Sequence, residues 1–213
     1  MQRSLDTVIE KYIYEKLISN FLQESLANRY GRNLKLYFET LTPNVLALKV
    51  SNILLGITES GGDNRGELVD SILRSAGGTP GLAWCAALQQ VVEAFVEKYC
   101  NVTSSFPNGL GCVQIYQDAS KKNDVFTFPE LGDVMVWQSI DDNGKPLATG
   151  HMGRVVAVGD ILQVVEGNTG PGSGIQREGD GVYKKLRLMD KKYRTMQLLG
   201  YIRPEYNKKE EKV

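Results

Sequence analysis

The sequence contains three cysteines and a single histidine, and these residues set the nucleophilic chemistry that it can support. Cys85 follows a glycine-rich turn and opens a stretch of helical periodicity, so its thiol is expected at the N-terminus of a helix. The positive end of a helix dipole stabilises a thiolate, which is the form that attacks carbonyl carbons. Cys100 lies at the far end of the same stretch and Cys112 lacks this setting, so both are interpreted as small buried residues. Cys85 is therefore the candidate nucleophile, and ordinary burial is the alternative.

A thiolate nucleophile needs a base, and His151 is the one imidazole in the chain. Imidazole accepts a proton near neutral pH, and an acceptor on its second nitrogen holds it in the working tautomer. Glu166 and Asn168 are the candidate acceptors. We expect Glu166 to be the main partner because a carboxylate forms a charge-assisted bond, with Asn168 in support, and the reverse assignment stays open. The alternatives are a solvated carboxylate at Glu166 and a turn residue at Asn168.

A predicted β-hairpin brings these candidates together. Residues 151–158 and 161–166 have strand periodicity, and Gly159-Asp160 between them suits a tight turn. A hairpin centred on that turn places His151 opposite Asn168, with Glu166 two residues away on the same face. Such neighbours have Cβ atoms about 5–8 Å apart, so either side chain reaches the imidazole.

Helical periodicity dominates the first part of the chain and strand periodicity the second. Helices are predicted over residues 5–28, 43–58, 67–75, 86–99 and around 111–120. Strands are predicted over residues 133–137, 151–158, 161–166, 182–188 and 196–202. This order predicts an α+β fold in which helices pack on an antiparallel β-sheet.

The composition is that of an ordinary globular protein and excludes several classes. Hydrophobic residues make up 42% of the 213 residues and charged residues 23%, which argues against disorder. Lys and Arg number 25 and so do Asp and Glu, so nucleic-acid binding through bulk charge is not expected. A single histidine without a CxxC pair argues against a zinc site. No apolar run reaches the roughly 18 residues of a membrane span, so stable membrane insertion is not expected.

The chain is divided into three parts. Residues 1–42 are interpreted as an N-terminal helical extension, residues 43–206 as a catalytic domain and residues 207–213 as a charged tail. The N-terminus lacks the apolar core of a secretory signal peptide, so synthesis in the cytoplasm is expected. A monomer is expected.

Short blocks of this sequence resemble a known family. The blocks are residues 61–66 (GGDNRG), 81–88 (GLAWCAAL), 131–137 (LGDVMVW), 150–156 (GHMGRVV) and 165–169 (VEGNT). Each block is weak by itself, but their order and spacing resemble the CHAP family, the cysteine, histidine-dependent amidohydrolases/peptidases. The resemblance covers about residues 43–205. Members of this family are papain-like enzymes that cut bacterial peptidoglycan, and they are common in phage endolysins and bacterial autolysins.

The resemblance implies a papain-like cysteine hydrolase fold and a role for each candidate. Cys85 would be the nucleophile and His151 the base. Glu166 would orient His151, with Asn168 as a further polar residue beside the site. Trp84 would line the substrate groove, and ordinary core packing is the alternative for it.

The resemblance also implies the substrate, bacterial peptidoglycan, cut by an N-acetylmuramoyl-L-alanine amidase or an endopeptidase. Some relatives carry a calcium loop of aspartates before the cysteine, but residues 76–84 contain no acidic side chain, so no metal and no cofactor are expected. A phage lysin, released through a holin or carried in the virion, fits best. Alternatives are an injected amidase effector, a bacterial autolysin, an acyl hydrolase with another substrate, and a non-catalytic binding module.

Overall fold

The structure is a computed structural model that describes residues 3–23, 37–38, 40–172, 174, 178–189 and 195–209. Its helices are α1 (Thr7–Gln23), α4 (Pro43–Ile53), α5 (Glu67–Ser75), α6 (Cys85–Tyr99) and α7 (Cys112–Ser120). Its strands are β1 (Val102–Ser104), β2 (Val125–Phe126), β3 (Val134–Ile140), β4 (Pro146–Ala157), β5 (Leu162–Thr169), β6 (Gly181–Arg187), β7 (Met196–Ile202) and β8 (Tyr206–Lys208).

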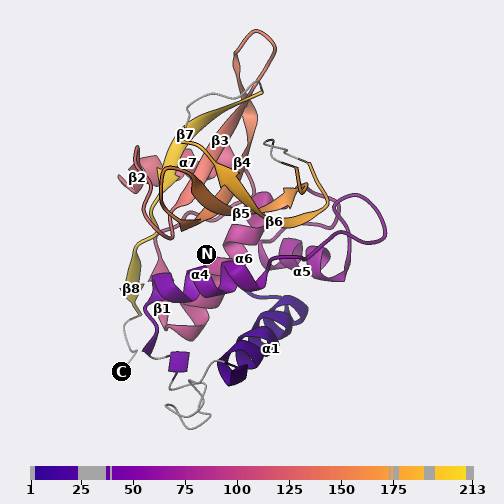
Figure 1. The fold of residues 1–213 in the computed structure, drawn as a ribbon, viewed down its shortest axis with the longest axis vertical. Coiled ribbons are helices and arrows are strands. Elements are labelled where there is room, and N and C mark those ends of the chain that lie inside the picture. The colour runs from indigo at the N-terminus through magenta and orange to yellow at the C-terminus, as the bar shows by residue number, and fades with distance from the viewer. Residues whose placement is uncertain are drawn as a thin grey trace.

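The strands form two antiparallel sheets. The larger has six strands in the order β2-β7-β3-β4-β5-β6, and β1 pairs with β8 in the smaller. In Figure 1 the large sheet occupies the upper part of the molecule, with α1, α4 and α5 below it and the β3–β4 hairpin projecting at the top. The predicted α+β class with an antiparallel sheet is confirmed.

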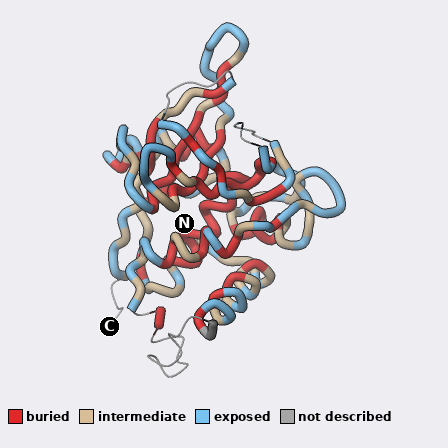
Figure 2. Tube along the Cα trace, in the orientation of Figure 1, coloured by how far each residue is buried: buried red, intermediate tan, exposed pale blue. Residues whose placement is uncertain are grey.

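Helix α6 lies at the centre of the fold. Its residues from Cys85 to Val96 are all buried, and Leu88, Val91 and Phe95 join an apolar core that also contains residues of α1, α4 and α5. A helix that is apolar on most sides is stable only when other elements surround it. Figure 2 shows this buried centre, with exposed residues concentrated in the loops and the projecting hairpin.

Helix α1 is attached to this core through its apolar stripe. Ile9, Ile13 and Leu17 belong to the same core as α4 and α6, and the Asp6 carboxylate pairs with Arg74 of α5 at 2.8 Å. The described part of residues 1–42 therefore packs on the helical layer. Residues 24–28 of the predicted first helix lie outside the described residues.

Helix α4 begins as predicted and ends earlier. The Thr42 hydroxyl accepts a hydrogen bond from the Val45 amide at 3.4 Å, and Pro43 occupies the first turn. The helix stops at Ile53, because the following segment turns away and Thr58 forms a β-bridge with Gly181 at the start of β6. The predicted helix end at residue 58 is therefore wrong.

Three strands were absent from the sequence prediction. β1, β2 and β8 contain only 3, 2 and 3 residues, too few for an alternating pattern to stand out. β8 includes Asn207 and Lys208, so this part of the expected charged tail is paired with β1. Residues 210–213 of that tail lie outside the described residues.

Candidate active site

The candidate nucleophile lies at the start of the central helix, as predicted. Cys85 is the first residue of α6. The Leu88 amide makes the first helical bond, to the Trp84 carbonyl at 3.0 Å, so the amides of Cys85, Ala86 and Ala87 have no acceptor within the helix. These amides carry the positive end of the helix dipole, which favours a thiolate at this position.

His151 lies on β4 with its two nitrogens in different settings. Nε2 lies 3.0 Å from Glu166 Oε2, whereas Nδ1 is buried and has no hydrogen-bond partner among the described residues. The neighbouring Cys85 thiol, like Glu166, raises the pKa of the imidazole. Nδ1 is therefore the nitrogen left to exchange a proton with Cys85. The Trp137 ring, directly opposite on β3, stacks on His151 at 5.9 Å between centroids.

Glu166 reaches His151 because of the strand register. β4 pairs with β5 so that Gly153 is opposite Glu166 and Arg154 is opposite Val165, which confirms the predicted register over these residues. A Cβ atom on Gly153 would lie 2.4 Å from Glu166 Cγ. The glycine therefore provides the space in which the Glu166 side chain crosses to the imidazole.

Arg187 on β6 completes the site and was missed by the sequence analysis. Its Nε donates to Glu166 Oε1 and its NH2 group to Oε2, each at 2.6 Å. Its guanidinium also lies 5.5 Å from the centre of the Trp137 ring. All four groups, Arg187, Glu166, His151 and Trp137, are buried. The sequence held no signal for this, because Arg187 and Lys185 point inward while their apolar neighbours Leu186 and Leu188 are exposed.

The electrostatics of these groups favour an ion pair between Cys85 and His151. The pKa of Cys85 is held well below its usual range, and the hydrogen bond with Cys112 is the largest cause. Burial acts in the opposite direction and raises the pKa, but His151 and the Ala86 amide lower it further. Burial alone would lower the pKa of His151, but Cys85 and Glu166 together raise it to about 9. Burial likewise disfavours ionised Glu166, and its bonds to His151 and Arg187 lower its pKa nevertheless.

Cys112 is the second residue that the sequence analysis undervalued. It was expected to be buried, and it is, but its Sγ lies 3.5 Å from the Sγ of Cys85. It is also the first residue of α7, after Gly111 at the N-cap. The helix-start setting that singled out Cys85 was thus present at Cys112 too. By contrast, burial raises the pKa of Cys100, at the C-terminal end of α6.

Asn168 holds the start of α6 instead of the imidazole. Its Oδ1 accepts from the Trp84 amide at 3.1 Å, and its Nδ2 donates to Asn64 Oδ1 at 2.8 Å and to the Gly179 carbonyl at 3.1 Å. The expected supporting contact with His151 is not formed among the described residues, because the amide is directed to these other partners and Nε2 of His151 faces Glu166. Asn168 therefore positions the segment that carries Cys85.

Trp84 is fully buried, in agreement with the packing alternative. Its indole nitrogen donates to Glu59 Oε1 at 2.9 Å. A Cβ atom on Gly167 would lie 3.0 Å from the ring, so the strand after Glu166 runs directly over it. In this structure Trp84 fixes the geometry of the loop and does not line an open groove.

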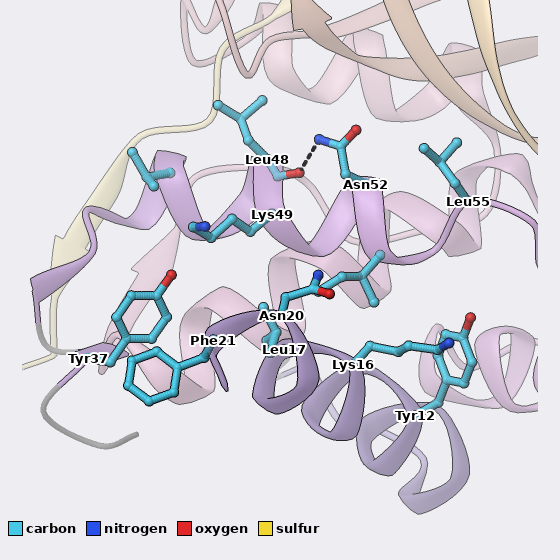
Figure 3. A pocket seen from close by; sticks show the side chains of 12 residues that line it. Tyr12, Lys16, Leu17, Asn20, Phe21, Tyr37, Leu48, Lys49, Asn52 and Leu55 are labelled. Atoms are coloured by element: carbon cyan, nitrogen blue, oxygen red, sulfur yellow. Dashed lines mark hydrogen bonds between the residues drawn. The ribbon is translucent and has the colours of Figure 1, made fainter. Parts of the chain in front are cut away.

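The reacting groups lie just below the surface. Cys85 is 3% exposed and His151 is fully buried. A pocket of about 340 Å³ lies beside Asn168, walled by Glu59, Asn64 and Asp180 among others. A separate groove of about 480 Å³ runs between α1 and α4 (Figure 3), and none of the predicted site residues lines it.

Among the described residues, no three His, Cys, Asp or Glu side chains are grouped so that they could hold a metal ion. In the same part of the chain, no helix has the length and apolar character needed to cross a membrane. Comparison with protein-family models, curated proteins and solved structures found no match to this chain.

Proposed function

We propose that this protein is a cysteine amidase or endopeptidase with a papain-like fold, similar to the CHAP family, that hydrolyses amide bonds of bacterial peptidoglycan. The observation that carries the proposal is the buried chain of hydrogen bonds from Arg187 through Glu166 to His151, whose Nδ1 is left for the Cys85 thiol that influences the imidazole electrostatically. It supplies a nucleophile, a base and an orienting carboxylate, which together are the parts needed for acyl transfer. The substrate class is inferred from the resemblance of the five sequence blocks, in their order and spacing, to the CHAP family.

In the proposed acylation step, the Cys85 thiolate attacks the carbonyl carbon of the scissile amide. The oxyanion that forms is stabilised by the Cys85 amide at the start of α6. His151 then transfers its Nδ1 proton to the leaving nitrogen, the C–N bond breaks, and an acyl thioester remains on Cys85.

In deacylation, water attacks the thioester and His151 Nδ1 accepts its proton. The carbon–sulfur bond breaks, which releases the carboxylic acid and restores the Cys85 thiolate. Throughout both steps Glu166 accepts the Nε2 proton of His151 in a hydrogen bond, so the imidazole keeps one orientation. Arg187 holds both oxygens of Glu166, which keeps the carboxylate ionised and aligned.

Burial of the site adds a requirement. Because Cys85 is only 3% exposed, a peptide substrate reaches Sγ only after the groups above it move. The beginning of α7 is one neighbour of the sulfur, since Cys112 Sγ lies 3.5 Å from Cys85 Sγ. The catalytic geometry is then completed in the substrate complex, as is common in hydrolases.

The test is digestion of purified peptidoglycan sacculi, followed by mass spectrometry of the released fragments. The wild-type protein should release muropeptides or stem peptides with one consistent new terminus, and that terminus identifies the scissile bond. Cys85→Ala should release none, and Cys100→Ser, the matched cysteine control, should match the wild type. The absence of fragments from the wild-type protein with sacculi of several wall types would refute the proposal.

Two other outcomes have distinct signatures. A non-catalytic binding module would sediment with sacculi yet release no fragments, with or without Cys85. A hydrolase with a non-wall substrate would leave sacculi intact, yet its Cys85 thiol would be acylated rapidly by a small activated ester. The acylated peptide is found by mass spectrometry, so the nucleophile and the substrate are tested separately.

A further inference from the structure

We propose that Cys85 and Cys112 form a redox-active pair, in which a peroxide converts the two thiols into a disulfide that caps the nucleophile and a dithiol reverses the reaction. Their sulfur atoms lie 3.5 Å apart, and both residues are buried. The inference goes beyond the proposed function, because bond formation depends on the thiol pair and not on any substrate.

The geometry limits the reaction to this pair. A disulfide bond has a length of about 2.0 Å, so the two sulfur atoms need to approach by about 1.5 Å, the scale of a side-chain rotation. Cys100 lies at the opposite end of α6, about 22 Å along the helix axis from Cys85. It is therefore out of reach of Cys85 while the helix is intact.

The chemical setting makes Cys85 the first sulfur to react. Thiolates, not thiols, attack peroxides, and the pKa of Cys85 is held well below its usual range by the hydrogen bond with Cys112 and by His151. Cys112 begins α7 as Cys85 begins α6, so both sulfurs lie at positive helix ends. The two sulfur atoms are already in hydrogen-bond contact, and once Cys85 is a thiolate the Cys112 thiol is the donor, so the second sulfur lies beside the first one before oxidation begins.

The reaction proceeds in two balanced steps. First, the Cys85 thiolate attacks one oxygen of hydrogen peroxide, the O–O bond breaks, and the departing hydroxide takes a proton from His151 to become water. Cys85 is then a sulfenic acid. Second, the Cys112 sulfur attacks the Cys85 sulfur, the S–O bond breaks, and the oxygen leaves as water with the Cys112 proton. The thiols lose two electrons in total, and the peroxide is reduced to two molecules of water.

The disulfide would have a defined effect on the molecule. It removes the nucleophile and joins the first residues of α6 and α7, so the two helix starts can no longer move apart. A dithiol such as dithiothreitol attacks the bond, takes up the oxidation as its own disulfide, and returns both thiols. Cys112 also prevents the further oxidation of Cys85 to a sulfinic acid, which dithiothreitol does not reverse.

The test uses the full chain and a cysteine variant that makes the peptide map unambiguous. Trypsin cuts after Arg74, Lys98 and Lys121, so one peptide carries Cys85 while the other carries both Cys100 and Cys112. In Cys100→Ser, a peptide linked to the Cys85 peptide therefore identifies the Cys85–Cys112 bond. The protein is treated with hydrogen peroxide, remaining thiols are capped with N-ethylmaleimide, and the digest is measured by mass spectrometry.

We expect the linked peptide in Cys100→Ser after peroxide and its loss after dithiothreitol. In Cys112→Ser, with its fold checked by circular dichroism, sulfinic acid should accumulate at Cys85 and dithiothreitol should not recover the thiol. The proposal is overturned if no linked peptide forms in Cys100→Ser, or if Cys85 of Cys112→Ser is recovered as fully as that of Cys100→Ser. Because the readout is a peptide mass, a linked peptide in a protein that cuts no peptidoglycan counts against the proposed hydrolysis only.

Discussion

Among the described residues, two pairs of a carboxylate and a guanidinium are almost completely buried, and their surroundings differ. Glu93 of α6 pairs with Arg154 of β4, and Glu166 of β5 pairs with Arg187 of β6. All four side chains are almost completely removed from solvent. By burial and charge alone the two pairs are equivalent.

Their partners distinguish them. Arg154 donates to the Gly132 carbonyl at 3.0 Å and to Gln89 Oε1 at 3.3 Å, and Glu93 also accepts from the Ser104 hydroxyl at 2.6 Å. This pair is surrounded by groups that neither titrate near neutral pH nor act as nucleophiles. It ties α6 to β4.

The second pair shares its carboxylate with a group that does titrate. Glu166 Oε2 contacts Nε2 of His151, whose other nitrogen is left for Cys85. A buried ion pair by itself therefore does not mark a candidate site. What distinguishes the Glu166–Arg187 pair is its contact with an imidazole that lies beside a thiol at a helix start.

The largest expected effect concerns Cys85, the thiol beside the imidazole that contacts the Glu166–Arg187 pair. Cys85→Ala should reduce peptidoglycan hydrolysis by on the order of 10³-fold or more, because it removes the thiolate that the proposed mechanism uses to attack the carbonyl. Fragment release is measured by mass spectrometry and the fold by circular dichroism. Turnover within tenfold of the wild type would contradict the nucleophile assignment.

A substitution in the Glu93–Arg154 pair should lower stability and leave the activity of the folded protein unchanged. Glu93→Gln removes one partner of a buried pair and leaves Arg154 without a counter-charge, so we expect a loss of about 3–5 kcal/mol in the free energy of unfolding. Urea denaturation measures it. The pH–rate profile of the folded variant should match that of the wild type. A shifted profile would mean that the Glu93–Arg154 pair is coupled to the Glu166–Arg187 pair.

Glu166→Gln should move the pH–rate profile and lower the rate. Without the carboxylate, the pKa of His151 falls from about 9, so the alkaline limb of the profile moves to lower pH. The rate at neutral pH should fall about 10- to 100-fold. Asn168→Ala is the matched control, and it should leave the alkaline limb in place since Asn168 bonds to the Trp84 amide. The reverse pattern would show that Asn168 orients the imidazole.

Gly153→Ala tests whether the space opposite Glu166 matters. The added methyl group would lie 2.4 Å from Glu166 Cγ, so it should displace the carboxylate and lower the rate by about tenfold. Gly172→Ala, where nothing lies within 4 Å, is the control and should be silent. Kinetics at a fixed pH and urea denaturation separate lost positioning from lost stability, and equal behaviour of the two variants would refute the idea.

Cys112→Ala should have the smallest effect, on the acid limb alone. The hydrogen bond with Cys112 is the largest cause of the low Cys85 pKa, so its removal raises that pKa and moves the acid limb to higher pH. The maximal rate should change by less than about threefold, since the nucleophile and the base remain. An unchanged acid limb would show that His151 and the helix dipole suffice to ionise Cys85.

Local pattern and turn chemistry determined much of the fold. The predicted bounds of α5 and β7 agree with the structure, and so does the pairing of β4 with β5 from Gly153 to Val155, although a register shift between Val155 and Ala157 separates these pairs from the predicted turn at Gly159-Asp160. The same reasoning placed Cys85 at a helix start and Glu166 beside His151. These predictions succeed because helix periodicity, caps and hairpin register depend on residues that are near one another in the chain.

Only the tertiary structure decided which other groups complete the site. Hydropathy favours Leu186 and Leu188, at the end of β6 and directly after it, as inward residues, but Lys185 and Arg187 point inward instead. The reversal is stable because Glu166 supplies the counter-charge for Arg187 and the Gly170 carbonyl accepts from Lys185 at 2.6 Å. A sequence pattern contains no information on such partners until the strands are paired.

The two roles beside Cys85 were likewise decided by packing. Cys112 meets Cys85 because α6 and α7 begin at the same place in the fold, and Asn168 meets the Trp84 amide because β5 ends there. The sequence by itself determined the longer helices and strands, except the end of α4, and the residue types that can do chemistry. The contacts that tune the thiol join residues that are far apart in the chain, so they depend on how whole elements pack.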